Sequence, residues 1–198
     1  EVLAASSAAT VGKRWSEVRT GWEAIQSGGL QMKPRDNLLA HTALIRKIIL
    51  ALHDMSDDGN LTLDPSADSY YLIDNVMRRV PDVSERLGRL RAMGTGVLAA
   101  KALDEQRRFD ISSQLGELNM ALADFNENLQ RAAANNPALQ TSLSRLEQEF
   151  AVVTSSVVNE LQEHMLKVDF EMAAPVYFAL ATKAIDMTYA KTYEVLIP

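Results

Sequence analysis

LGELNMALADFNENL, residues 115–129, carries the clearest structural signal in the sequence. Its large apolar residues are spaced alternately three and four positions apart, at Leu115, Leu118, Leu122, Phe125 and Leu129. This spacing keeps one narrow apolar stripe on a single face of an α-helix, as in a coiled coil. The stretch therefore predicts a long helix that packs lengthwise against a partner helix.

A second segment with the same spacing follows directly and is the natural partner. Its stripe consists of Leu139, Leu143, Leu146, Phe150, Val153, Val157 and Leu161. Between the two segments lies AANNP, residues 133–137, in which Asn136 can cap a helix and Pro137 suits the first helical position. Because the connection is so short, the two helices are expected to be antiparallel.

Helical spacing recurs through nearly the whole chain, whereas alternation with period two is scarce. We therefore predict an all-α protein, an elongated antiparallel helical bundle of the four-helix-bundle type. Asp64 with Pro65, and later Asp104, are expected to begin two of the helices. Pro81 lies inside a continuous helical pattern, so we expect a kink or break near Arg79. The predicted helices cover residues 2–27, 36–54, 65–102, 104–134, 137–166 and 170–196.

Composition excludes several classes of function. The chain has 198 residues, of which 47% are hydrophobic, and a formal net charge of −6 with scattered lysines and arginines. A nucleic-acid partner is therefore not expected. The absence of cysteine excludes disulfides and thiolate chemistry. No apolar run approaches the ~20 residues that cross a bilayer. Since the chain starts without methionine and stops within an apolar pattern, we interpret it as a segment of a longer protein.

The stretch DMSDDGNLTLDPSADSYYLID, residues 54–74, resembles a calcium loop in its first half. Asp54, Ser56 and Asp58 occupy the first three ligand positions. The closing bidentate carboxylate, however, would fall on Pro65, which has no side-chain oxygen. A solvated turn followed by the start of a helix is therefore the favoured interpretation.

The second half of that stretch predicts a small polar cavity between two helices. Tyr71 and Arg78 share one side of the helix, and Tyr70 lies on a neighbouring side. The preceding helix supplies His41, and Asp74 can pair with Arg78. Such a cavity could hold an anion or a polar metabolite. The predicted ligand-binding residues are His41, Tyr70, Tyr71, Asp74 and Arg78.

Each of these residues also has a structural interpretation, which stays open. The two tyrosines can be edges of the core with exposed hydroxyls, His41 can be a packing histidine, and the arginine can simply pair with an acid on its own helix. Trp15 and Trp22 are seven positions apart, and we expect them to anchor a helix seam. The stretch from Gly94 to Gly96 can be a flexible point or a packing accommodation.

No catalytic or metal-binding constellation is found in the sequence. The chain has only three histidines and no Glu-x-x-His motif of the kind used by ferritin-like bundle enzymes. We therefore expect no enzymatic activity, no catalytic residue, no metal and no cofactor.

Residues 39–99 resemble the extracytoplasmic helical sensor regions of bacterial transmembrane receptors. Such receptors include methyl-accepting chemotaxis proteins, sensor histidine kinases and diguanylate cyclases. The most specific pieces are HTALI (41–45), NLTLDP (60–65), DSYYLID (68–74) and LGRLRAMGTGVLA (87–99). No HAMP linker, methylated hairpin or kinase motif accompanies them, so the output class rests on analogy.

The resemblance implies that residues 1–198 form one periplasmic sensor domain of an inner-membrane receptor that works as a homodimer. Six helices suggest two stacked bundles that share long helices. Sensors of organic acids are expected to use arginines and polar side chains between helices, which fits Arg78 with His41 and Tyr71. The alternative is a helical protein-interaction or mechanosensing module without a small-molecule pocket. A polar cavity beside these side chains would distinguish the two.

Overall fold

The computed structural model of the chain describes residues 2–197, with the side chains of residues 10–61 and 63–197. The regular structure in the described residues is helical throughout, so the predicted all-α bundle is confirmed. The α-helices are α1 (Val2–Gly28), α2 (Pro34–Asp58), α3 (Ala67–Asp74), α4 (Val80–Ala100), α5 (Glu105–Asn135), α6 (Gln140–Asn159) and α7 (Ala174–Leu196).

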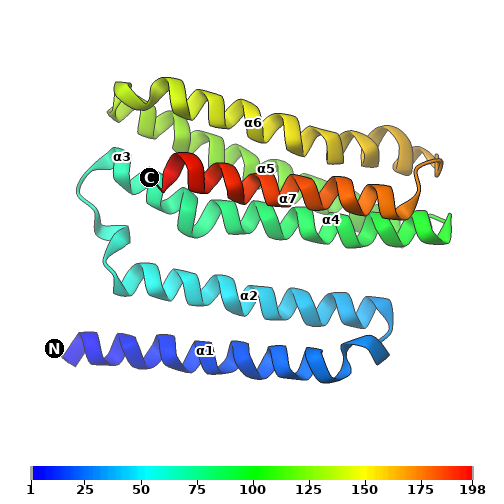
Figure 1. Cartoon of the computed structure of the whole chain (residues 1–198), viewed down its shortest axis with the longest axis horizontal. Helices are drawn as coiled ribbons and strands as arrows, with labels where there is room; N and C mark the ends of the chain where they lie inside the picture. Colours follow the sequence, from blue (N-terminus) through cyan, green and yellow to red (C-terminus); the bar gives the residue numbers. More distant parts are fainter. Residues whose placement is uncertain (1, 198) are drawn as a thin grey trace.

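Four long helices form one antiparallel bundle, and two more lie beside it (Figure 1). In the bundle, α4 packs on α5 and α7, and α6 packs on both α5 and α7. The short α3 leads into α4 and packs on α5. Helices α1 and α2 form an antiparallel hairpin, which we call the hairpin, and α2 contacts α4. The hairpin lies alongside the bundle (Figure 1), whereas the sequence suggested two stacked bundles that share long helices.

The paired stripes predicted for α5 and α6 form the centre of the bundle. Leu118 and Phe125 of α5 are fully buried, as are Leu146 and Val157 of α6. The rings of Phe125 and Phe150 stack with their centroids 4.4 Å apart and an angle of 12° between their planes. This stacking adds to the apolar burial that holds the two helices together. The predicted antiparallel pair is confirmed.

Pro81 shapes the helix that contains it. Residues Asn75–Arg79 form a π turn between α3 and α4, in which the N–H of Val80 donates to the C=O of Asn75. The ring of a proline clashes with the carbonyl four residues earlier, and a wider turn just before it relieves that clash. The predicted break near Arg79 is confirmed, and its form is a π turn, a feature often found at functional sites.

Two helix starts were predicted, one at Asp104 and one at Asp64 with Pro65, and the structure contains the first of them. The side chain of Asp104 accepts a hydrogen bond from the N–H of Arg107 at 2.7 Å, which confirms it as the N-cap of α5. The expectation for Asp64 and Pro65 was wrong, because α3 begins at Ala67. Asp64 instead accepts a hydrogen bond from the N–H of Ser66 at 2.8 Å, which forms a local turn before the helix.

Gly94 is a point of close packing. The ring of Tyr177 in α7 is fully buried against α4, and its hydroxyl donates to the C=O of Leu90 at 3.0 Å. A Cβ atom on Gly94 would lie 2.4 Å from Cε1 of that ring. The glycine therefore makes room for the tyrosine, which favours the packing interpretation of this stretch over the flexible one.

The two tryptophans of α1 do not lie in a seam within the chain. Val18 and Ile25 are buried against α2, but 58% of Trp15 and 51% of Trp22 are exposed. The expectation that both tryptophans anchor a seam was wrong for the single chain. The hairpin presents them to its surroundings.

His164 and Asp169 lie across the turn between α6 and α7, with His164 Nδ1 2.8 Å from Asp169 Oδ2. This hydrogen bond raises the pKa of His164 above its ordinary 6.5 and lowers the pKa of Asp169. The contact should be fully stabilising below pH 6.5 and above the ordinary carboxyl pKa of about 3.9. Its contribution should be lost as the pH rises through the folded-state pKa of His164, or falls through that of Asp169.

A pH titration of the His164 ring by NMR tests this contact. We expect a midpoint above 6.5 in the wild type and a lower midpoint in Asp169→Asn, which removes the carboxylate. A wild-type midpoint at or below 6.5 would contradict the contact.

Candidate functional site

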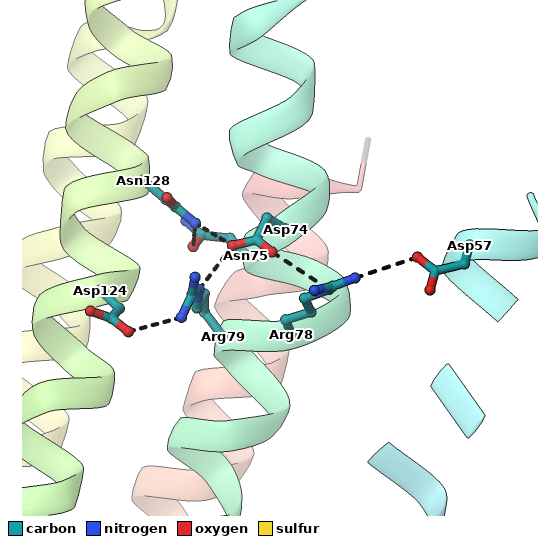
Figure 2. Close-up of polar contacts among 7 residues, drawn as sticks. All are labelled: Asp57, Asp74, Asn75, Arg78, Arg79, Asp124 and Asn128. Atoms are coloured by element: carbon teal, nitrogen blue, oxygen red, sulfur yellow. Dashed lines mark hydrogen bonds and ion pairs between the residues drawn. The ribbon is translucent and has the colours of Figure 1, made fainter. Parts of the chain in front are cut away.

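Polar side chains gather where the π turn meets α5 (Figure 2). Asn75 is fully buried, and its amide Nδ2 donates to the C=O of Phe125 at 3.2 Å. Its Oδ1 accepts from Asn128 Nδ2 at 3.1 Å, and the same nitrogen donates to Asp74 Oδ2 at 2.8 Å. Because the buried amide has partners on both of its polar atoms, this network holds the π turn firmly on α5.

Arg79 extends the same network. Its guanidinium donates to Asp74 and to Asp124 of α5, each at 2.8 Å. Burial would lower the pKa of Arg79, but the hydrogen bond and the negative charges outweigh it and raise that pKa. With short charge-assisted bonds to two carboxylates, Arg79 has a structural role at the base of α4.

Arg78 points the other way, toward α2 (Figure 2). Its Nη2 lies 3.4 Å from Oδ1 of Asp57, and its Nε lies 3.7 Å from Oδ1 of Asp74. These contacts are long compared with the 2.7–2.9 Å typical of charge-assisted hydrogen bonds. The side chain is 40% exposed. An incoming anion could therefore take up hydrogen bonds that Arg78 does not make with its present partners.

The facing side of α2 carries unused polar atoms. Ser56 and Asp57 lie three and four positions after His53, so the three side chains lie on the same side of α2. The contact of Asp57 with Arg78 shows that this side faces the π turn. Ser56 is fully buried. Within the described part of the chain, neither its Oγ nor the buried Nε2 of His53 has a hydrogen-bond partner. Such atoms are costly to leave unpaired, and here a bound ligand could pair them. We call His53, Ser56, Asp57, Asp74 and Arg78 the junction site.

The electrostatic surroundings keep His53 neutral near pH 7. Its pKa is lowered from 6.5, first by burial and then by the positive charge of Arg78. The carboxylates of Asp57, Asp74 and Asp54 act in the opposite direction but are outweighed. A neutral imidazole has one N–H donor and one acceptor nitrogen. The junction site therefore combines one cation and two neutral groups able to donate hydrogen bonds with the carboxylates of Asp57 and Asp74, whose contacts with Arg78 are long.

Four of the five predicted ligand residues lie on α3 and the π turn, and two of these belong to the junction site. Asp74 and Arg78 are in contact there. Tyr71 instead faces α5, where its hydroxyl accepts a hydrogen bond from Arg131 at 3.3 Å and the guanidinium lies 5.5 Å from its ring centroid. The ring of Tyr70 meets Tyr71 edge-on at 5.3 Å. Both tyrosines therefore pack against neighbouring side chains, which agrees with their structural interpretation.

His41 is not brought to the junction site. It lies sixteen residues before Asp57 on α2, about 24 Å away along the helix axis at 1.5 Å per residue. Its Nδ1 is 2.9 Å from the C=O of Asn37, one turn back on the same helix. The histidine beside Arg78 is His53, which the sequence interpretation missed. The sequence signal for His53 was its position three and four residues before Ser56 and Asp57.

Comparisons with protein-family models, curated proteins and solved structures find no match to this chain. Between residues 2 and 197, none of the helices has the length and apolarity needed to span a membrane. Over the same residues, no three histidine, aspartate or glutamate side chains are grouped so that they could hold a metal ion. The geometry of the junction site and the sequence resemblance are the grounds for a functional proposal.

Proposed function

We propose that the chain is the extracytoplasmic ligand-sensing domain of a bacterial transmembrane signalling receptor, and that it binds a small organic acid at the junction site. The observation that carries the proposal is the position of Arg78, whose contacts are long and whose charge acts on His53, one helical turn from the unpaired Ser56 Oγ. A carboxylate offers acceptors for the guanidinium and for either neutral donor. Binding would therefore satisfy groups that the chain alone leaves unpaired.

The course of the chain supports this proposal. Helix α1 begins, and helix α7 ends, at the same end of the elongated molecule (Figure 1). A periplasmic domain that is inserted between two membrane-anchored segments of a receptor needs both of its ends on the membrane side, and the positions of these two helix ends agree with that. The homodimer that the resemblance implies is part of the same proposal.

A ligand at the junction site would contact two parts of the molecule at once. The π turn is held on α5 by Asn75 and Arg79, so it is the fixed side of the site. Helix α2, with His53 and Ser56, belongs to the hairpin and is the side that can move. A ligand shifts such an arrangement only if it binds the two packings with different affinity. Signalling by repacking of the hairpin needs no chemical reaction and no cofactor.

The exposure of the two tryptophans favours a second function, a helical protein-interaction or mechanosensing module. Trp15 and Trp22 lie on one face of α1, more than half exposed. Aromatic side chains in such positions are common centres of protein interfaces. In that case a partner protein would cover this face, and small acids would have no effect on the domain.

A thermal-shift screen of the purified domain against acetate, succinate, malate, citrate and benzoate tests the proposal. Ligand at about 100 times its Kd adds about 2.7 kcal/mol of stability, which raises the midpoint of a domain of this size by about 5–10 °C. We expect Arg78→Ala to abolish the shift. Ser56→Ala should weaken it without lowering the stability of the free domain, because the hydroxyl it removes is buried and unpaired.

Arg145→Ala is the matched control. The side chain of Arg145 is 73% exposed and pairs with Glu149 one turn along α6. Its removal should leave the acid-induced shift unchanged. The proposal fails if no acid shifts the wild type, or if Arg78→Ala responds as the wild type does.

A further inference from the structure

A groove lies between α5 and α6, two helices that contribute no residue to the junction site. Its volume is about 220 Å³. The buried ring of Phe150, with Leu122 and Val158, gives it an apolar wall, and Ala151 lines it from the exposed side of α6. Four polar side chains also line it, those of Asn119, Asn126, Thr154 and Ser155.

Two hydroxyl oxygens and one amide oxygen of this groove can accept a hydrogen bond from a ligand, beside the N–H donors of the Asn119 and Asn126 amides. The hydroxyl of Thr154 donates to the C=O of Phe150 at 2.7 Å, and that of Ser155 donates to the C=O of Val152 at 3.0 Å. Each hydroxyl has one hydrogen, so both oxygens can only accept a further bond. The Oδ1 of Asn126 is buried, and no donor for it is found among the described residues. A buried unpaired acceptor in a groove is a place for a ligand that donates a hydrogen bond.

The lining also restricts the charge and size of a ligand. The side chains that line the groove in the described part of the chain are all uncharged. A charged ammonium would lose hydration there without gaining a counter-ion. For comparison, an apolar cavity of ~150 Å³ holds benzene. The groove therefore has room for one ring or a short branched chain.

We propose that the groove between α5 and α6 binds a small neutral molecule that joins an apolar body to one O–H or N–H donor. The apolar body lies on Phe150 and Leu122, and the donor bonds to Oδ1 of Asn126. This site is independent of the junction site, since it shares no residue with it and takes a neutral donor in place of an anion.

Benzyl alcohol is a suitable probe, with benzyl methyl ether as the comparison that keeps the ring and the oxygen but has no donor. Titration of isotope-labelled protein, followed by amide chemical shifts, should show changes at Asn126, Thr154 and Ser155. One net hydrogen bond corresponds to about fivefold in Kd, so we expect the alcohol to bind about fivefold more tightly than the ether. The absence of shifts at these residues would overturn the proposal.

Three variants distinguish the contribution of the Asn126 acceptor from that of the volume of the groove. In Asn126→Ala the fivefold preference for the alcohol should disappear, and a preserved preference would overturn the assignment. Ala151→Leu should fill the groove and weaken both probes at least tenfold. Gln148→Leu adds the same side chain at an exposed position of α6 outside the groove, so it should leave both affinities unchanged. Equal effects of the two leucines would also count against the site.

Discussion

Replacing Gly94 by alanine is expected to lower the free energy of unfolding by about 2–3 kcal/mol, as overpacking a full core does. The added Cβ would lie 2.4 Å from Cε1, 2.6 Å from Cζ and 2.8 Å from the hydroxyl oxygen of Tyr177. The ring cannot easily withdraw, because it is fully buried and its hydroxyl bonds to Leu90. Helices α4 and α7 would have to separate locally.

Gly88→Ala and Gly96→Ala are the matched controls on the same helix. A Cβ at either position meets no atom within 4 Å. Both changes should be neutral or should stabilise by up to about 1 kcal/mol, since alanine is the better helix former. Thermal unfolding measures the contrast, with a fall of the midpoint by about 4–12 °C for Gly94→Ala alone. If all three variants unfold at the same temperature, the tight contact of α4 with α7 is incorrect.

Replacing Asn75 by alanine is expected to cost about 2–4 kcal/mol, the second large effect. The change removes a fully buried side chain, its bond to the C=O of Phe125 and the acceptor of Asn128. It leaves a small cavity in the core and removes two buried hydrogen bonds, and both losses are destabilising. Since the π turn positions Arg78, the same variant should also weaken acid binding.

Asn135→Ala is the matched control for Asn75→Ala. Both variants are compared with the wild type by urea unfolding at constant pH. The side chain of Asn135 is exposed and bonds to the C=O of Arg131, one turn back on α5. A change of less than about 0.5 kcal/mol is expected there. Equal destabilisation by the two substitutions would show that the buried amide network does not stabilise the π turn.

The parts of the fold that were predictable depend on signals close together in the sequence. The stripes of α5 and α6 repeat over several turns, so they specify a helix, its buried face and its partner at once. Pro81 acts through covalent geometry, since its ring excludes an ordinary helical turn before it. Both features were predicted at the correct positions.

The arrangement of the hairpin was not predictable in the same way. His41 and His53 both lie on α2, about 18 Å apart at 1.5 Å per residue, and only the packing of α2 on the bundle decides which of them meets Arg78. The heptad spacing of Trp15 and Trp22 predicts a shared face but does not say what covers it. Contacts between helices distant in sequence decide the first question, and in the structure both tryptophans are more than half exposed.

The response of the histidine rings to an organic acid tests the junction site most directly. At a fixed pH of 7.5, the ring resonances of His41 and His53 would be followed by NMR while succinate or malate is added to saturation. The account predicts that the His53 resonance shifts and the His41 resonance does not, and that Arg78→Ala suppresses the shift. A His53 resonance that stays in place, or a shift of His41 in its stead, would contradict acid binding at the junction site.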